Sequence, residues 1–488
     1  MKNLIDLIVP DAKKQGSLYL KDRLQRGLYT FIGHESFGGI LLFVCVVVAM
    51  IIANTPSLAS YYFGFWASEI GITFNEYSKN MSILHLINDI LMSFFFLMVG
   101  LEMKREVLYG DLAGFKKVSF STFAAIGGIC IPIAIYLYFN HGTPSSNGFG
   151  VAMSTDTAFA LGVILLMGKR IPSVIKIFLV TLAVADDLGA VTVIAIFYTE
   201  NLNTTAIVVA LLIICVLIYI NWRDTKFLFL YIVLGIFLWI AVYKSGIHPT
   251  IAAVILAFCI PGRTKVSEAY FDKMVKEWGK IDFEEIENLK KNARKIEKRN
   301  FLHSFYRSVK NFMAPTIEKQ IDMKRASEYV HILDNIAHYS QHAKNPLLSM
   351  EHALQPICAY FIVPLFAFAN GGVTITGDFL NLFSDKIVLG TILGLVVGKP
   401  IGIVLFAYLS EKLNISLRPK GLTYPHVLAV GFLAGIGFTM SMFVSSLAYE
   451  DQTMVDTSKL SVLIASSLAV VCGVISLFFS TSVSKKEK

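Results

Sequence analysis

Charged residues are scarce in this chain. Asp, Glu, Lys and Arg make up 16% of its 488 residues, whereas hydrophobic residues make up 55%. Soluble globular domains carry about 25% charged residues, so the composition excludes an ordinary soluble domain. We predict an all-α protein that crosses a membrane several times, because a helix satisfies its own backbone hydrogen bonds in lipid.

Cysteine is also rare. None of the six cysteines belongs to a Cys-x-x-Cys or Cys/His motif, and all of them lie within apolar runs. This pattern excludes the common sequence signatures of zinc and redox sites. We interpret the cysteines as small hydrophobic residues and expect neither a disulfide nor a cofactor. They are Cys45, Cys130, Cys215, Cys259, Cys358 and Cys472.

Residues 1–36 lack the continuous apolar core of a secretory signal peptide. They mix basic with acidic residues, so we expect this segment to stay in the cytoplasm. The formal net charge of the whole chain is +8, which on its own suggests a nucleic-acid partner. The basic residues gather in particular connections between apolar runs, however, and this distribution indicates membrane topology. We therefore expect no nucleic acid.

Apolar runs long enough to cross about 30 Å of hydrocarbon occur twelve times. Their lengths, near twenty residues, favour helices over barrel strands. They lie near residues 37–53, 84–108, 118–140, 148–168, 172–198, 203–221, 226–243, 246–261, 351–370, 386–410, 423–448 and 459–480.

Basic residues alternate between the connections that join these runs. If the chain starts in the cytoplasm, the even-numbered connections carry at least two Lys or Arg each, whereas the odd-numbered ones carry one at most. Cytoplasmic loops are enriched in Lys and Arg, so the pattern predicts twelve crossings with both termini in the cytoplasm. The single lysines of the odd-numbered connections are Lys79, Lys244, Lys386 and Lys459.

Two connections are unusually long. Residues 54–83, on the predicted outer side, alternate Ile70, Ile72 and Phe74 in a pattern that fits either a short strand or an irregular loop. Residues 262–350 hold more basic than acidic residues, and we predict a cytoplasmic insert of amphipathic helices or a partly ordered charged connector, either of which could rest on anionic lipid. The predicted division is 1–36 and 481–488 as cytoplasmic ends, 37–261 and 351–480 as membrane segments, and 262–350 as the insert.

Two adjacent acids, Asp186 and Asp187, lie inside the apolar stretch KIFLVTLAVADDLGAV. A charged residue at the bilayer centre costs ~2.5–3.5 kcal/mol, so both need a function or a partner. Neighbouring carboxylates in a low dielectric resist simultaneous ionisation, and their oxygens bind hard cations once deprotonated. The pair predicts a site where protons and a cation compete; a structural pair neutralised by a nearby Lys is the alternative. Their side chains diverge by about 100° on a helix, which disfavours an aspartyl protease.

A third acid, Asp156, follows Ser154 and Thr155 and precedes Thr157, in an apolar run flanked by glycines. Four consecutive oxygen-bearing side chains compete for backbone hydrogen bonds, which favours a broken helix. An acidic residue there can neutralise the N-terminal ends of half-helices. A plain N-cap at the membrane interface is the alternative.

The run at 430–448 is interrupted in a similar way, by Gly435 and Gly437 followed by Thr439 and Ser441. Interrupted spans in corresponding positions, here the fourth and the eleventh, indicate a midplane binding site between inverted repeats. Glycines that permit close helix packing are the alternative.

Lys399 lies inside the tenth run, in the stretch GLVVGKPIGIVL. A buried ammonium needs a partner, so we expect it to pair with Asp186 or Asp187 unless it snorkels to the interface. Pro400 is expected to kink the helix beside it.

Acidic and basic side chains gather where the second run ends and the ninth begins. Glu102, Arg105 and Glu106 lie within about one helical turn, and Glu351 and His352 open the ninth run on the same predicted side. Such a cluster can sense pH or attract cations. Ordinary interfacial ion pairs are the alternative.

Several motifs together resemble one known family. TDTAFALGV, KIFLVTLAVADDLGAV, GIHPTIAAV, PLFAFANGGV, GKPIGI and GIGFTMSMF occur in this order. They are similar to motifs of the NhaA-type sodium/proton antiporters of bacteria. The similarity covers about residues 35–261 and 350–480.

The resemblance implies an inner-membrane antiporter of twelve helices, with two crossed broken helices at the fourth and eleventh spans. It implies that Asp186 and Asp187 bind Na⁺ or Li⁺ in competition with protons. Thr155 and Asp156 would support this site and balance helix dipoles, and Lys399 would pair with Asp186.

The resemblance also implies a cytoplasmic pH-response region, formed by Glu102, Arg105, Glu106, Glu351 and His352. Family members with the double Asp and the Lys are electrogenic and form homodimers through the outer loop between the first two spans. The long insert at 262–350 departs from the short connection expected in this family.

The sequence therefore predicts a secondary active transporter rather than an enzyme. It would export sodium in exchange for protons and so serve pH and sodium homeostasis. Two alternatives belong to other classes. A cation channel would use acidic residues without proton coupling, and a proton-coupled transporter of organic solutes would need a larger, aromatic-lined cavity.

Overall fold

The computed structural model describes residues 36–74, 77–109, 115–168, 171–199, 202–223, 225, 227–262, 272–273, 275–276, 278, 345–375 and 383–483. By its internal contacts the chain divides into two compact units, one formed by Met1–Ile260 with Met350–Lys488 and the other by Pro261–Ser349. The predicted N-terminal segment, most of the predicted insert and the last five residues lie outside the described residues.

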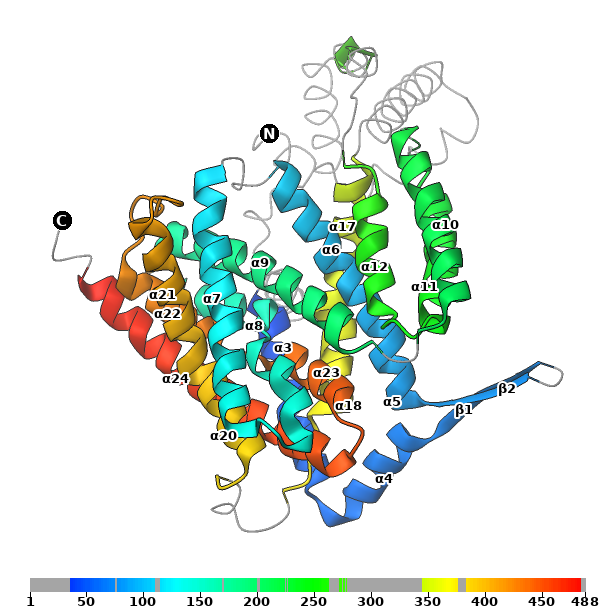
Figure 1. The fold of residues 1–488 in the computed structure, drawn as a ribbon, viewed down its shortest axis with the longest axis horizontal. Coiled ribbons are helices and arrows are strands. Elements are labelled where there is room, and N and C mark those ends of the chain that lie inside the picture. Colours follow the sequence, from blue (N-terminus) through cyan, green and yellow to red (C-terminus); the bar gives the residue numbers. More distant parts are fainter. Residues whose placement is uncertain are drawn as a thin grey trace, which may run out of the picture. The chain divides into compact units, whose positions relative to one another are not determined.

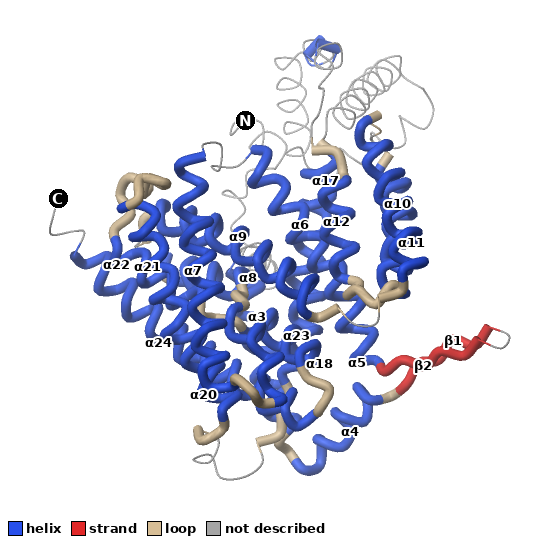
Figure 2. The backbone as a smooth tube through the Cα atoms, viewed as in Figure 1, coloured by secondary structure: helices blue, strands red, loops and turns tan. Residues whose placement is uncertain are grey.

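Helices make up nearly all of the described chain (Figures 1 and 2). The elements of the first part are α3 (Ser36–Ala53), α4 (Pro56–Ala67), β1 (Glu69–Phe74), β2 (Tyr77–Ser82), α5 (Ile83–Leu86), η1 (Ile87–Leu91), α6 (Met92–Tyr109), α7 (Phe115–Asn140), η2 (Pro144–Met153), α8 (Thr157–Leu166), α9 (Ser173–Phe197), α10 (Thr204–Trp222), α11 (Leu228–Lys244) and α12 (Thr250–Cys259). Those of the second part are α17 (Pro346–Ile357), η4 (Cys358–Ile362), α18 (Val363–Gly371), α20 (Lys386–Leu393), η5 (Gly394–Gly398), α21 (Lys399–Lys412), α22 (Tyr424–Ala434), α23 (Phe438–Ala448) and α24 (Gln452–Val483).

Among the described residues, eight helical stretches are long and apolar enough to cross a membrane. The number rises to ten if two bent pairs, α3 with α4 and α22 with α23, each count as one crossing. α11 and α12 are apolar but shorter. Helix is found in each of the twelve predicted apolar runs, so the helical fold class is confirmed, whereas twelve crossings stay a prediction.

The connection at 54–83 contains regular structure. α4 is followed by an antiparallel hairpin, in which β1 and β2 pair from Glu69 with Ser82 to Phe74 with Tyr77. The alternation of Ile70, Ile72 and Phe74 therefore belongs to a strand rather than an irregular loop. Within the described residues this hairpin departs from the all-α expectation, and Figure 2 shows it in red.

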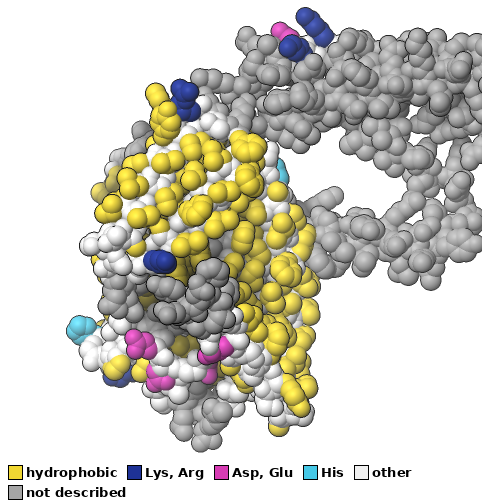
Figure 3. All heavy atoms as spheres, turned by 90° about the vertical axis from the view of Figure 1, so that its right-hand side faces the viewer, with side chains coloured by type: hydrophobic (Ala, Val, Ile, Leu, Met, Phe, Trp, Pro, Cys, Tyr) yellow, Lys and Arg dark blue, Asp and Glu magenta, His cyan; other side chains and the backbone are white. Residues whose placement is uncertain are grey.

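The surface over α10 and α11 is apolar (Figure 3). Only 11% of the apolar stretch that makes up α10 is buried inside the protein. Soluble proteins rarely expose so large an apolar face, so this surface fits contact with lipid chains. Its exposed side chains include Val208, Leu211, Leu212, Ile218, Phe229, Ile236 and Phe237.

Two groups of helices can be distinguished by their contacts. α7 packs on α9 and α21, α22 packs on α21 and α24, and α23 packs on η2 and α24; we call these helices, with α20 and η5, the α7 group. α6 packs on α12, and α3 packs on α18; with η1 and η4 they form the α6 group. The two groups meet where α6 packs on α9, where α18 packs on α23, and at α8, which packs on α3 and on α9.

Three π-turns, η1, η4 and η5, interrupt the described membrane helices. η4 and η5 are followed closely by Pro364 and Pro400, and a proline ring clashes with the carbonyl group four residues earlier. Those carbonyls belong to Tyr360 in η4 and Val396 in η5. A π-turn widens the helix at this point and relieves the clash. The effect expected from Pro400 thus takes the form of a π-turn directly before Lys399.

Candidate functional site

The fourth apolar run is a broken helix. The 3₁₀-helix η2 ends at Met153, Ser154–Asp156 have no regular structure, and α8 begins at Thr157. Asp156 has an extended backbone and caps α8, since its Oδ1 accepts a hydrogen bond from the N–H of Phe159 at 3.0 Å. Regular helical structure is therefore interrupted at residues 154–156.

The eleventh run is interrupted as well. α22 and α23 are inclined by 49° to each other, with Gly435–Gly437 between them. A Cβ atom added at Gly435 would collide with the backbone carbonyl of Leu395. Glycine therefore lets this turn of the chain lie directly against η5.

The two interruptions contact each other. The N–H of Asp156 donates to the carbonyl of Ile436 at 2.6 Å, and the Thr155 hydroxyl donates to the carbonyl of Ala434 at 2.8 Å. Asp156 Oδ2 accepts from both the N–H and the hydroxyl of Thr439, at 3.2 and 2.6 Å. The buried Asp156 carboxylate thus accepts hydrogen bonds at the N-terminal ends of both α8 and α23, where negative charge is favourable.

Lys399 connects this contact to the aspartate pair on α9. Its ammonium donates to Asp186 Oδ2 at 2.7 Å and also to the carbonyl of Met153 at the end of η2. The Lys399 side chain is 0% exposed, so it does not snorkel to the interface. Its carboxylate partner is Asp186, which is 213 residues away in the sequence.

The two aspartates differ in their surroundings. Asp186 is buried, and its Oδ1 has no hydrogen-bond partner. Asp187 is partly exposed, and its Oδ2 lies 3.5 Å from the hydroxyl of Thr157. Within the described part of the chain, no Lys or Arg nitrogen lies within 4 Å of the Asp187 carboxylate. One member of the pair is therefore neutralised, and the other is not.

A small space lies beside the ion pair. It is too small to hold a water molecule, and it is lined by the polar residues Thr155, Asp186 and Lys399 and by the apolar residues Leu179, Leu182, Ala183, Ile403 and Ala434. Its oxygen-bearing side chains are those of Thr155 and Asp186, and oxygen ligands are what hard cations such as Na⁺ prefer. Because protonated carboxylates bind cations poorly, such a site can exchange protons for a cation.

The predicted cluster at the end of α6 forms in part. Arg105 lies 2.8 Å from Glu106 and 4.0 Å from Glu102, and it also pairs with the buried Glu351. The exposed His352 makes no hydrogen bond or ion pair within the described residues. Four of the five predicted members are thus brought together around one guanidinium group.

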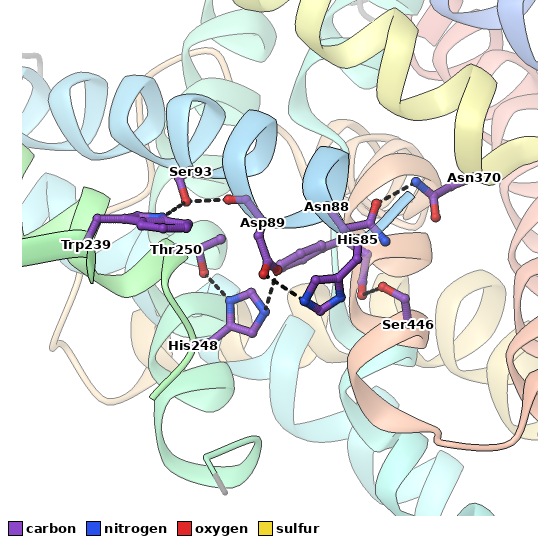
Figure 4. Close-up of polar contacts among 10 residues, drawn as sticks. His85, Asn88, Asp89, Ser93, Trp239, His248, Thr250, Asn370 and Ser446 are labelled. Carbon is purple, nitrogen blue, oxygen red and sulfur yellow. Dashed lines mark hydrogen bonds and ion pairs between the residues drawn. The ribbon is translucent and has the colours of Figure 1, made fainter. Parts of the chain in front are cut away.

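A second polar cluster surrounds η1 and was not expected from the sequence (Figure 4). The buried Asp89 carboxylate lies 3.2 Å from His85 Nε2 and 4.0 Å from His248 Nε2, and His248 Nδ1 lies 2.9 Å from the Thr250 hydroxyl. The His248 side chain, between α11 and α12, is 10% exposed, so this cluster lies largely inside the protein.

The sequence also misplaced one lysine. Lys459 was assigned to a connection, but α24 begins at Gln452, and the Lys459 side chain is 5% exposed inside it. Polar residues precede Lys459, namely Gln452, Thr453, Asp456, Thr457 and Ser458, so hydropathy does not show that the helix begins before it. Thr439 and Thr157 likewise gain their contacts with Asp156 and Asp187 only in the folded chain.

Comparison with known proteins identifies the family. Residues 29–477 match the family described as Na⁺/H⁺ antiporter 1. The chain belongs to this family. The resemblance to NhaA-type antiporters is thereby confirmed, and the chain is a multi-pass membrane protein.

Three similar proteins are named as Na⁺/H⁺ antiporters. A Na⁺/H⁺ antiporter NhaA 2 of Helicobacter hepaticus is 46% identical over 470 residues, which cover 96% of this chain and 98% of the relative. The Na⁺/H⁺ antiporter NhaA of Wolinella succinogenes is 45% identical over 93% of this chain and 92% of its own length. The Na⁺/H⁺ antiporter NhaA of Helicobacter pylori is 44% identical over 94% and 96%.

Proposed function

We propose that this chain exchanges Na⁺ for protons across a membrane as a secondary active transporter, with Asp186 and Asp187 as the binding carboxylates. The observation that carries this proposal is the adjacent aspartate pair beside two interrupted helices, with only Asp186 neutralised by Lys399. Family membership and relatives named as Na⁺/H⁺ antiporters support the choice of ions. Li⁺, which also prefers oxygen ligands, is the second proposed cation.

Competition at one site produces the exchange. Na⁺ settles on the Asp187 carboxylate, the Thr157 hydroxyl and the unpartnered oxygen of Asp186 only after protons have left. Protonation of the carboxylates removes the charge that holds Na⁺ and releases it. Alternating access to the two sides of the membrane then couples the two ion flows.

The interrupted helices give this site its polar surroundings inside the membrane. Asp156 balances the N-terminal ends of α8 and α23, and Thr155 holds the end of α22, so direct hydrogen bonds join the two interruptions. We infer that they are the two crossed broken helices of an inverted-repeat fold with twelve crossings. The hydrogen bonds between Ser154–Asp156 and Ala434–Thr439 support this inference.

The remaining assignments follow from the family resemblance and the charge pattern. The protein would lie in the bacterial inner membrane as an electrogenic exchanger in contact with lipid, with both termini and the insert at 262–350 in the cytoplasm. The hairpin of β1 and β2 would form the homodimer contact. Arg105 with Glu102, Glu106, Glu351 and His352 would respond to cytoplasmic pH.

Replacing Asp187 with Asn tests the site. In everted vesicles that hold a proton gradient, added Na⁺ should restore the fluorescence of a quenched pH dye with the wild-type chain but not with Asp187→Asn. Asp451→Asn is the matched control, because Asp451 is exposed in the connection before α24 and should leave exchange intact. Exchange retained by Asp187→Asn would refute the assignment.

The same assay separates the alternatives. A cation channel would carry Na⁺ without moving protons, so a sodium gradient would not change the internal pH once the membrane potential is clamped. A transporter of organic solutes needs far more room than the gap beside Asp186, which is too small to hold a water molecule.

A further inference from the structure

A second buried lysine lies outside the proposed ion site. The ammonium of Lys459, in α24, donates a hydrogen bond to Asn370 Oδ1 at 3.1 Å. Asn370, at the end of α18, is 1% exposed. Its Nδ2 donates a second hydrogen bond to Asn88 Oδ1 in η1 at 2.8 Å (Figure 4). Three elements are thus joined by one chain of hydrogen bonds.

This chain of bonds runs between the two helix groups. α24 belongs to the α7 group, whereas α18 and η1 belong to the α6 group. Apolar contacts cross at the same place, because Phe443 of α23 lies 5.6 Å from Phe96 of α6 and 6.3 Å from Phe366 of α18 between ring centroids. Apolar contacts are not directional and allow sliding, so the hydrogen bond from Lys459 sets how the groups are aligned here.

The opposite end of α6 differs. There, Arg105 pairs with Glu351 on α17, the helix that continues through η4 into α18. Both residues lie on the α6 side, so this ion pair does not tie the two groups together. The α6 and α7 groups are therefore linked by a charged hydrogen bond at the η1 end. The ion pair of Arg105 adds no such link at the opposite end of α6.

We propose that Lys459 is a positioning residue for transport. Through Asn370 it holds the α7 group against the α6 group at the η1 end. This contact opens whenever the ion site becomes accessible from the side of the membrane at which η1 lies. The proposal rests on the proposed exchange function. Lys459 touches neither cation nor proton site; it sets the balance between two access states.

The strength of this contact determines the expected effect. A hydrogen bond from a charged group contributes enough to shift a two-state equilibrium by about tenfold. The apparent affinity at one face scales with the fraction of molecules open to that face. Loss of the contact should therefore change the apparent Na⁺ affinity in opposite directions at the two faces, whereas damage to the ion site would lower the affinity at both.

The test compares Na⁺ half-saturation at the two faces in right-side-out and everted vesicles. With Lys459→Met, we expect the half-saturating Na⁺ concentration at the η1 face to fall by up to about tenfold, with a smaller change in the opposite direction at the other face. Asn370→Leu, which removes the acceptor, should have the same effect, and the double variant should add little to it. Lys459→Arg, which keeps a donor, should restore wild-type values.

Lys244→Met serves as the matched control, since Lys244 is exposed at the end of α11 and should leave both values unchanged. The proposal would be overturned if Lys459→Met and the wild type had the same half-saturating Na⁺ concentration at both faces. It would also be overturned if Lys459→Met changed this concentration in the same direction at both faces, or if Lys459→Arg did not show wild-type values. If Lys459→Met does not fold, Asn370→Leu decides between the same outcomes. A wild-type chain without sodium/proton exchange would instead refute the proposed function.

Discussion

Two lysines are buried in the part of the chain that the structure describes, and they are held in different ways. Lys399 lies between the Asp186 carboxylate and the Met153 carbonyl, whereas the described hydrogen-bond partner of Lys459 is the neutral amide of Asn370, and the Asp456 carboxylate acts on Lys459 only at longer range. A full counter-charge makes the first contact hard to remove, because the partner left behind would be an unpaired buried charge. Breaking the contact with an amide leaves one charge, the Lys459 ammonium, without its acceptor rather than two opposite charges, so the second contact can break and re-form at a smaller cost.

This difference matches the positions of the two residues. Lys399 joins η2, α9 and α21, which all belong to the α7 group and can move together. Lys459 joins α24 to α18, which belong to different groups. The strong contact therefore lies inside one group of helices, and the weaker one lies where two groups meet.

The largest effect is expected from Lys399→Met. It leaves Asp186 buried without its cation, which should lower the free energy of unfolding by ~3–5 kcal/mol. Unfolding in detergent would measure this loss. Lys399→Met combined with Asp186→Asn should recover most of it, and a double variant as unstable as the single one would show that the ion pair is not the cause.

An almost equal effect should appear at Lys459 once its partner is charged. Asn370→Asp turns the second contact into a buried ion pair of the Lys399 kind, and in this background Lys459→Met should lower the unfolding free energy by ~3 kcal/mol. The control is Lys459→Met with Asn370 intact. Similar losses in both backgrounds would contradict the idea that the partner's charge separates the two lysines.

A moderate effect is expected from Asp156→Ala, which tests the acid shared by two helices near Lys399. Loss of the cap on α8 and of the bonds from Thr439 should lower the unfolding free energy by ~2 kcal/mol. Asp385→Ala is the control, because Asp385 caps α20 alone, through the N–H of Ile387, and should lower it by ~1 kcal/mol. Equal losses would mean that the contact with Thr439 adds no stability.

The smallest effect on stability should come from Lys459→Met in the native background. The lost hydrogen bond is offset by the removal of a charge from an apolar environment, so the unfolding free energy should change by ~1 kcal/mol or less. The same denaturation experiment measures it. A loss as large as that of Lys399→Met would break the comparison between the two lysines.

Much of the ion site could be predicted because its residues are charged where their neighbours are not. Asp156, Asp186, Asp187 and Lys399 each interrupt an apolar run, and polar side chains at the membrane midplane need partners. Lys459 met the same condition but was placed at the start of a run, since hydropathy does not mark where a helix begins. The structure starts α24 at Gln452, which puts Lys459 inside the helix.

The sequence by itself determined which segments are helical and that Asp156, Asp186 and Lys399 lie inside apolar runs, because hydropathy and helix breaking depend on neighbouring residues. Only the tertiary structure decided the partners: Asp186 for Lys399, Thr439 for Asp156 and Asn370 for Lys459, across 213, 283 and 89 residues of sequence. A hydrogen bond requires its two atoms to lie about 3 Å apart, and distances between remote segments are set by how whole helices pack.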